Sequence, residues 1–128
     1  STMIRIPASR GMATRTEVRS VDVAANPYLA ISAILRAGLD GIEGNCKKFP
    51  PIYDDLYSMD DEGRAKIGVE SLPASLEDAI KEFKKDSLMQ EAVGEHITNK
   101  MIEAKTIEWN EYRRHVSDWE IKRYIDRY

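Results

Sequence analysis

A short stretch with charge on one face constrains this chain most. Residues 14–20 read Thr-Arg-Thr-Glu-Val-Arg-Ser, and this alternation with β-branched residues predicts a strand. Because side chains alternate between the two faces of a strand, Arg15, Glu17 and Arg19 should share one face. A carboxylate between two guanidiniums is costly on a core-facing strand but suits a site that handles anions and a metal. The alternative is an exposed strand face with salt bridges.

The other strand candidate is the segment at residues 3–7, Met-Ile-Arg-Ile-Pro, which a proline closes. The roughly six residues that follow contain Ser9, Arg10 and Gly11 and predict a turn, with Arg10 interpreted as a solvated turn residue. The two strands would then form an antiparallel hairpin that brings Arg5 near the charged face. A two-stranded hairpin is marginal on its own, so we expect it to need further strands.

The remainder of the chain predicts helices. Asn26-Pro27 is a strong helix start, and residues 28–43 are apolar at nearly every position, which predicts a helix buried on most sides and ending near Gly41 and Gly44. Residues 45–73 predict an irregular connection with one short helix at 60–67. Capping residues and helical spacing then predict helices at 76–85, from 86 or 87 to 93, at 95–114 and at 118–126.

The predicted fold class is therefore α+β and mostly helical. Residues 1–44 would form the hairpin and a core helix, residues 45–73 an exposed loop, and residues 74–128 a helical C-terminal subdomain. The length of 128 residues suits one domain. Because the chain starts at Ser1 without an initiator methionine, we expect it to be a piece of a longer protein.

Composition excludes some classes of partner. A net charge of −3 and a pI of about 5.4 argue against nucleic acid as the main partner. The longest apolar run, near residues 28–35, is too short to cross a bilayer. Cys46 is the only cysteine, which fits a reducing, cytoplasmic setting. His96 and His115 have no second ligand at metal spacing, so structural roles are favoured for both.

Short motifs follow one another along the chain: Arg5-Ile6-Pro7, Arg15-x-Glu17-x-Arg19, Ala24-Ala25-Asn26-Pro27-Tyr28-Leu29, Ala37-Gly38-Leu39-Asp40-Gly41-Ile42, Gly94-Glu95-His96, Glu108-Trp109 and Asp118-Trp119-Glu120. This ordered set resembles the C-terminal segment of type I glutamine synthetases of bacteria and archaea. The resemblance covers essentially the whole chain. Any one of these motifs alone would be weak, whereas the set in this order is specific.

The resemblance implies a role for each charged residue of the hairpin. Glu17 matches a glutamate that ligates an active-site Mg²⁺ or Mn²⁺, and Arg19 matches an arginine that engages the carboxylate of substrate glutamate. Arg15 matches a nucleotide-site arginine, and Arg5 matches an arginine that contacts the transferring phosphate. The implied reaction is ATP-dependent: the side chain of glutamate is phosphorylated, and ammonia then displaces phosphate.

The resemblance also implies a larger assembly. The hairpin would be part of a larger catalytic barrel, and the parent enzyme would be a homo-oligomer of two stacked hexameric rings, a dodecamer, into whose opposite ring the C-terminal helix inserts. Most metal ligands and the ammonia site would lie upstream of Ser1, so we expect this chain alone to be inactive. The alternatives are a segment of a related γ-glutamyl-amine ligase and a helical interaction module without catalysis.

Tyr57 lies where some members of the family carry a tyrosine that is adenylylated to switch off activity. However, Tyr57-Ser58-Met59 followed by the acidic run 60–62 looks more like the subfamily that lacks this control and is inhibited by glutamine. We therefore expect Tyr57 to be unmodified.

Overall fold

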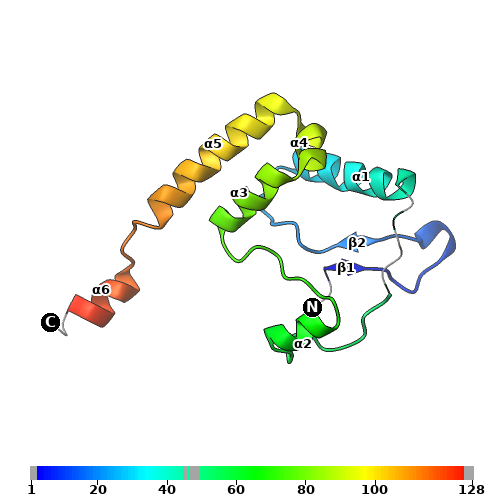
Figure 1. The fold of residues 1–128 in the computed structure, drawn as a ribbon, viewed down its shortest axis with the longest axis horizontal. Helices are drawn as coiled ribbons and strands as arrows, with labels where there is room; N and C mark the ends of the chain where they lie inside the picture. The colour runs from blue at the N-terminus through cyan, green and yellow to red at the C-terminus, as the bar shows by residue number, and fades with distance from the viewer. Residues whose placement is uncertain (1–2, 45, 47–49, 126–128) are drawn as a thin grey trace. The chain divides into compact units, whose positions relative to one another are not determined.

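The structure is a computed structural model that describes residues 3–44, 46 and 50–125. The chain divides into two compact units, Ser1–Leu72 and Pro73–Tyr128. Among the described residues, the first unit contains both strands and the first two helices, and the second unit contains the remaining four helices; Figure 1 labels them in chain order.

The first unit begins with the predicted antiparallel hairpin. Strand β1 (Ile4–Arg5) pairs with β2 (Glu17–Val18), and the register places Arg5 opposite Glu17. The Arg19 amide donates to the Met3 carbonyl at 2.9 Å and extends the pairing by one step. Both strands are shorter than predicted, because no third strand in the described residues pairs with either of them. A 3₁₀ turn, η1 (Gly11–Ala13), lies in the connection, and Gly11 has the positive φ of 67° that glycine adopts readily.

Helix α1 (Pro27–Glu43) has the predicted start. The Asn26 side chain accepts from the amides of Tyr28 and Leu29 at 3.0 and 3.4 Å, and Pro27 occupies the first helical position. Gly44 ends the helix, whereas Gly41 lies within it.

The expected burial of α1 is not found within this chain. None of its residues is buried. Leu29 is half-buried, and the other large apolar residues are exposed by 39% to 81% of their surface: Tyr28, Ile31, Ile34, Leu35, Leu39 and Ile42. Burial on several sides needs several surrounding elements. Within the described part of the first unit, no other strand or helix packs on α1.

Helix α2 (Asp61–Lys66) confirms the short helix predicted in the connection, and Asp60 caps it by accepting from the Gly63 amide at 2.8 Å. Arg64 of this helix donates to the Leu56 and Met59 carbonyls at 3.2 and 2.8 Å and so holds the turn that precedes it. Part of the expected loop, residues 45 and 47–49, lies outside the described residues.

The second unit is built from α3 (Leu76–Lys85), α4 (Ser87–Val93), α5 (Glu95–Tyr112) and α6 (Asp118–Tyr124). Ser75 caps α3. Asp86 caps α4, which decides between the two starts, 86 and 87, that the sequence allows. Ser117 and Glu120 form a capping box at the start of α6. Helix α5 ends two residues earlier than predicted, and the predicted end of α6 at Asp126 falls outside the described residues.

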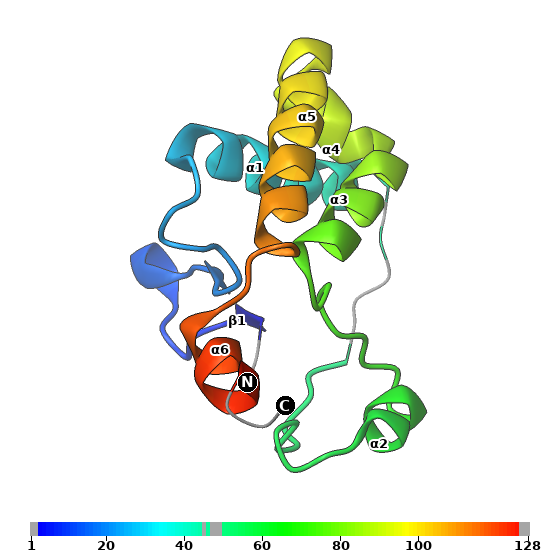
Figure 2. The same ribbon diagram turned by 90° about the vertical axis from the view of Figure 1, so that its left-hand side faces the viewer.

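Helices α3, α4 and α5 pack on one another, as Figure 2 shows. Thr98 is buried here, and its hydroxyl donates to the Gln90 carbonyl at 3.3 Å. The Gln90 side chain in turn donates to the Phe83 and Lys84 carbonyls, both at 3.0 Å, so α4 is tied to the end of α3. Across the described residues, no large hydrophobic side chain is fully buried.

None of the helices in the described part of the chain combines the length and the apolar character that a membrane crossing needs.

Candidate functional site

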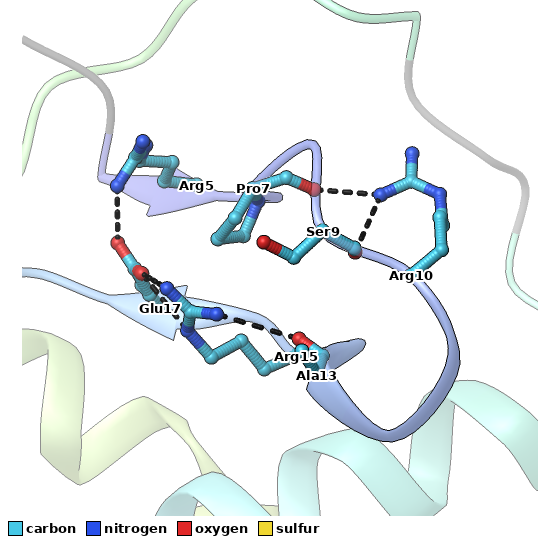
Figure 3. A network of polar contacts seen from close by, with 7 residues as sticks. All are labelled: Arg5, Pro7, Ser9, Arg10, Ala13, Arg15 and Glu17. Carbon is cyan, nitrogen blue, oxygen red and sulfur yellow. Dashed lines mark hydrogen bonds and ion pairs between the residues drawn. The ribbon is translucent and has the colours of Figure 1, made fainter.

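The charged residues of the hairpin meet at Glu17. The strand register places Arg5 directly across from Glu17, and the Arg5 Nη1 donates to Glu17 Oε2 at 2.9 Å. Paired residues of an antiparallel ladder lie close enough for such contacts. Figure 3 shows the guanidinium of Arg5 reaching down from β1 to this carboxylate on β2.

Arg15 binds the other oxygen of the same carboxylate. Its Nη2 and Nε donate to Glu17 Oε1 at 2.8 and 3.1 Å, and its Nη1 reaches the Ala13 carbonyl at 3.3 Å. Arg15 precedes Glu17 by two residues, so the two side chains share a face as the strand alternation predicts. Each oxygen of Glu17 is thus held by a different arginine (Figure 3).

The electrostatics of this cluster favour the charged carboxylate. The hydrogen bonds from Arg5, and then from Arg15, lower the pKa of Glu17 below its ordinary value. Desolvation of the carboxylate opposes this lowering, and the positive charges of the two arginines add to it. The side chain of Glu17 is 30% exposed, whereas those of Arg5 and Arg15 are 55% and 52% exposed. The cluster carries a net positive charge and opens toward solvent, which suits the binding of an anion.

Arg19 is not part of this network. Its side chain makes no hydrogen bond or ion pair with another residue of the described ranges, although its amide continues the strand pairing. The structure therefore brings together Arg5, Arg15 and Glu17 and leaves the guanidinium of Arg19 available for another ligand.

Glu17 could supply one ligand of a metal ion but not a complete site. The described residues hold no group of three or more histidine, cysteine, aspartate or glutamate side chains that could enclose a cation. Mg²⁺ is often bound by one or two carboxylates with water and phosphate oxygens completing the shell. The donor set present, one carboxylate beside two phosphate-compatible guanidiniums, fits a shared metal–phosphate site of this kind.

Arg10 has contacts that the sequence interpretation did not anticipate. Its Nη1 donates to the Pro7 carbonyl at 2.6 Å and to the Ser9 carbonyl at 3.0 Å (Figure 3). The interpretation of Arg10 as a solvated turn residue is therefore incomplete. Its place three residues after a proline, where a turn leaves carbonyls without strand partners, is a signal that could have indicated this role.

Tyr57 lies in an exposed turn of the first unit. Its side chain is 84% exposed, and its amide binds the Asp55 carboxylate at 3.1 Å. Nothing in this geometry bears on whether its hydroxyl is modified, so the expectation of an unmodified Tyr57 stays a prediction. Cys46 is a free and exposed thiol.

Comparisons with known proteins agree on one family. Residues 1–124 match the family model for "Glutamine synthetase, catalytic domain". Glutamine synthetases of Staphylococcus aureus and Staphylococcus epidermidis are each 47% identical to the chain over all 128 residues. A solved structure described as "Apo GmaS without ligand" superposes with a TM-score of 0.78 at 35% identity and covers 97% of this chain.

The mostly helical fold, the charged hairpin and these matches define a segment of a catalytic domain of the glutamine synthetase class. The chain belongs to the glutamine synthetase family, which confirms the resemblance found in the sequence. It spans 29% of the length of the staphylococcal relatives and 27% of the GmaS chain.

Proposed function

We propose that this chain supplies one wall of the active site of an ATP-dependent glutamate–ammonia ligase, which makes glutamine through γ-glutamyl phosphate. The observation that carries the proposal is the Arg5–Glu17–Arg15 cluster. In this cluster one carboxylate binds two arginines, one from each arm of the hairpin. Its membership of the glutamine synthetase family supports the same reaction.

Each residue of the hairpin would act on a different charged group. Arg5 would stabilise the negative charge that develops on the transferring phosphoryl group, and Arg15 would bind the phosphates of ATP. Arg19, whose guanidinium has no partner among the described residues, would bind the carboxylate of substrate glutamate. Guanidinium forks suit all three tasks because they match carboxylate and phosphate geometry.

Glu17 would be one ligand of a Mg²⁺ or Mn²⁺ ion. The metal would neutralise phosphate charge and orient ATP, which is the chemistry that such ions supply in phosphoryl transfer. Without ligands, Glu17 balances the charge of Arg5 and Arg15. Phosphate oxygens of ATP would offer Arg5 and Arg15 another binding partner, and Glu17 would then hold the cation.

The proposal is tested in the complete gene product that contains this chain. Glu17→Gln keeps the shape of the side chain but removes its charge, and we expect ATP-, glutamate- and ammonium-dependent phosphate release to fall at least about 100-fold, as for loss of a group that stabilises the transition state. Glu103→Gln is the matched control, because Glu103 is also a glutamate in an ion pair, with Lys100 at 2.7 Å. Its activity should stay within about twofold. Full activity of the Glu17→Gln protein would exclude Glu17 as a metal ligand.

The 128-residue chain itself should show no turnover. One carboxylate cannot complete a metal site, and the described residues offer no second group that could. Glutamate- and ammonium-dependent phosphate release by the purified chain would contradict this.

The cluster does not distinguish ammonia from a larger amine as the acceptor, since none of its residues is assigned to that substrate. The ratio of kcat/KM for ammonium to that for a small primary amine, measured on the complete protein, separates a glutamine synthetase from a γ-glutamyl-amine ligase.

The same proposal makes the parent enzyme a cytoplasmic dodecamer of two stacked rings. Helix α6 would contribute to the contact between rings, and its exposed Trp119 and Tyr124, which contact each other edge to face, are suited to burial against another subunit.

A further inference from the structure

We propose that Arg10 is a positioning residue for the phosphate-binding arginine Arg5. The role of Arg5 in binding phosphate comes from the proposed function. The positioning role of Arg10 is inferred from its own hydrogen bonds.

The contacts of Arg10 lie on the chain that leaves β1. Its guanidinium bridges the carbonyls of Pro7 and Ser9 through a single nitrogen, at 2.6 and 3.0 Å. Pro7 comes two residues after Arg5 and is itself buried. Proline has no amide hydrogen, so the carbonyl is its only backbone hydrogen-bonding group, and a buried carbonyl needs a partner. Arg10 supplies that partner.

Little else holds this part of the hairpin. The strands β1 and β2 are two residues long each, and a hairpin of this size is marginal by itself. Among the described residues, the two bonds from Arg10 are the only side-chain hydrogen bonds to the backbone of residues 6–10. Figure 3 shows Arg10 partway along the connection between β1 and β2, on the other side of Pro7 from the carboxylate of Glu17.

A loosened Pro7–Arg10 segment would move the backbone from which Arg5 projects. The 2.9 Å pair between Arg5 and Glu17 depends on the register of β1 against β2, so a small displacement of β1 separates them. A misplacement of about 1 Å in a positioned catalytic group can reduce the rate about 100-fold. Arg10 does not bind Glu17 or any other charged side chain of the described residues, so its effect would pass through the backbone.

The kinetic test uses Arg10→Gln in the complete gene product, with Arg64→Gln as a matched control. Arg64 is also an arginine whose Nη1 bridges two loop carbonyls, those of Leu56 and Met59, but it serves a different loop. We expect Arg10→Gln to lower kcat by about 10- to 100-fold with the KM for glutamate within twofold of wild type. Arg64→Gln should leave kcat within twofold. Arg10→Lys, which keeps a donor for one carbonyl, should recover part of the lost kcat.

A crystal structure of the Arg10→Gln protein without nucleotide gives a readout that does not need activity. The expected result is a displaced Pro7–Arg10 segment and a broken Arg5–Glu17 pair. An intact pair in that structure overturns the proposal, as does a kcat for Arg10→Gln equal to that of Arg64→Gln. If the wild-type protein shows no ligase activity, the proposed function fails, while the structure still decides whether Arg10 positions Arg5.

Discussion

At the scale of single residues, the cluster is held together by one carboxylate. Glu17 accepts three hydrogen bonds from two guanidiniums, although much of the cluster is exposed to solvent. Exposed ion pairs contribute little to stability, because water and salt screen them. The ion pairs therefore add little to the stability of the fold, and their main effect is to hold the guanidiniums of Arg5 and Arg15 beside the Glu17 carboxylate.

The pKa of Glu17 should reveal these contacts in solution. We expect an NMR titration to place it below the ordinary value of 4.5, because the bonds from Arg5 and Arg15 favour the charged form. Since the folded pKa is lowered, the stabilising contribution of Glu17 is complete above 4.5 and is lost as the pH falls through the folded pKa. Arg5→Gln should raise the pKa of Glu17 toward 4.5. A pKa that does not respond to Arg5→Gln would argue against the pair.

At the scale of elements, the helices are defined by their caps. The Ser75 hydroxyl accepts from the Asp78 amide at 3.1 Å and donates to the Asp78 carboxylate at 2.7 Å. The Ser117 hydroxyl makes the same two bonds to Glu120 at the start of α6, whereas the Asp86 carboxylate caps α4 by accepting from the Met89 amide at 3.0 Å. Such bonds span only three residues, so the helix starts are local properties of the sequence.

Removing one cap should have a measurable cost. We expect Ser75→Ala to lower the free energy of local unfolding of α3 in the complete protein by about 1 kcal/mol. Hydrogen exchange of the α3 amides measures this change. Ser87→Ala is the matched control, because Ser87 is also a serine at the start of a helix but follows the cap residue Asp86 and caps nothing. Equal effects of the two substitutions would show that the Ser75 cap is not used.

At the scale of the whole molecule, the described part of the chain has no closed hydrophobic core. The described residues include no fully buried hydrophobic side chain, and the apolar side chains of α1 are exposed. Burial of apolar surface is the main favourable term in folding, at roughly 25 cal/mol per Å², so little of that term is available to this chain alone. An exposed apolar surface of this kind is expected on a helix that other parts of a larger domain cover.

The purified chain should therefore behave as an incompletely packed protein. We expect it to bind a hydrophobic dye strongly and to unfold over a broad temperature range, with far-UV and near-UV signals that do not coincide. Leu35→Lys, on the exposed face of α1, should weaken dye binding, whereas Lys66→Arg on the polar helix α2 should not. A single cooperative transition with no dye binding would instead favour the helical interaction module.

The sequence by itself determined the local structure and the family. The starts of α1, α3, α4 and α6 follow from Asn26, Ser75, Asp86 and Ser117, because a cap acts on amides two or three residues away. The antiparallel hairpin and the shared face of Arg15 and Glu17 follow from strand alternation, and the family follows from the ordered motifs.

Only the tertiary structure decided which charges meet and which apolar surfaces remain exposed. The pairing of Arg5 with Glu17 depends on a register between residues 12 positions apart, and alternation within one strand cannot fix it. The same is true of Arg19, which shares the predicted face but lies outside the network, and of Arg10, whose partners are backbone carbonyls. The exposure of α1 also could not be read from its apolar composition, because burial depends on the elements that surround a helix and not on the helix alone.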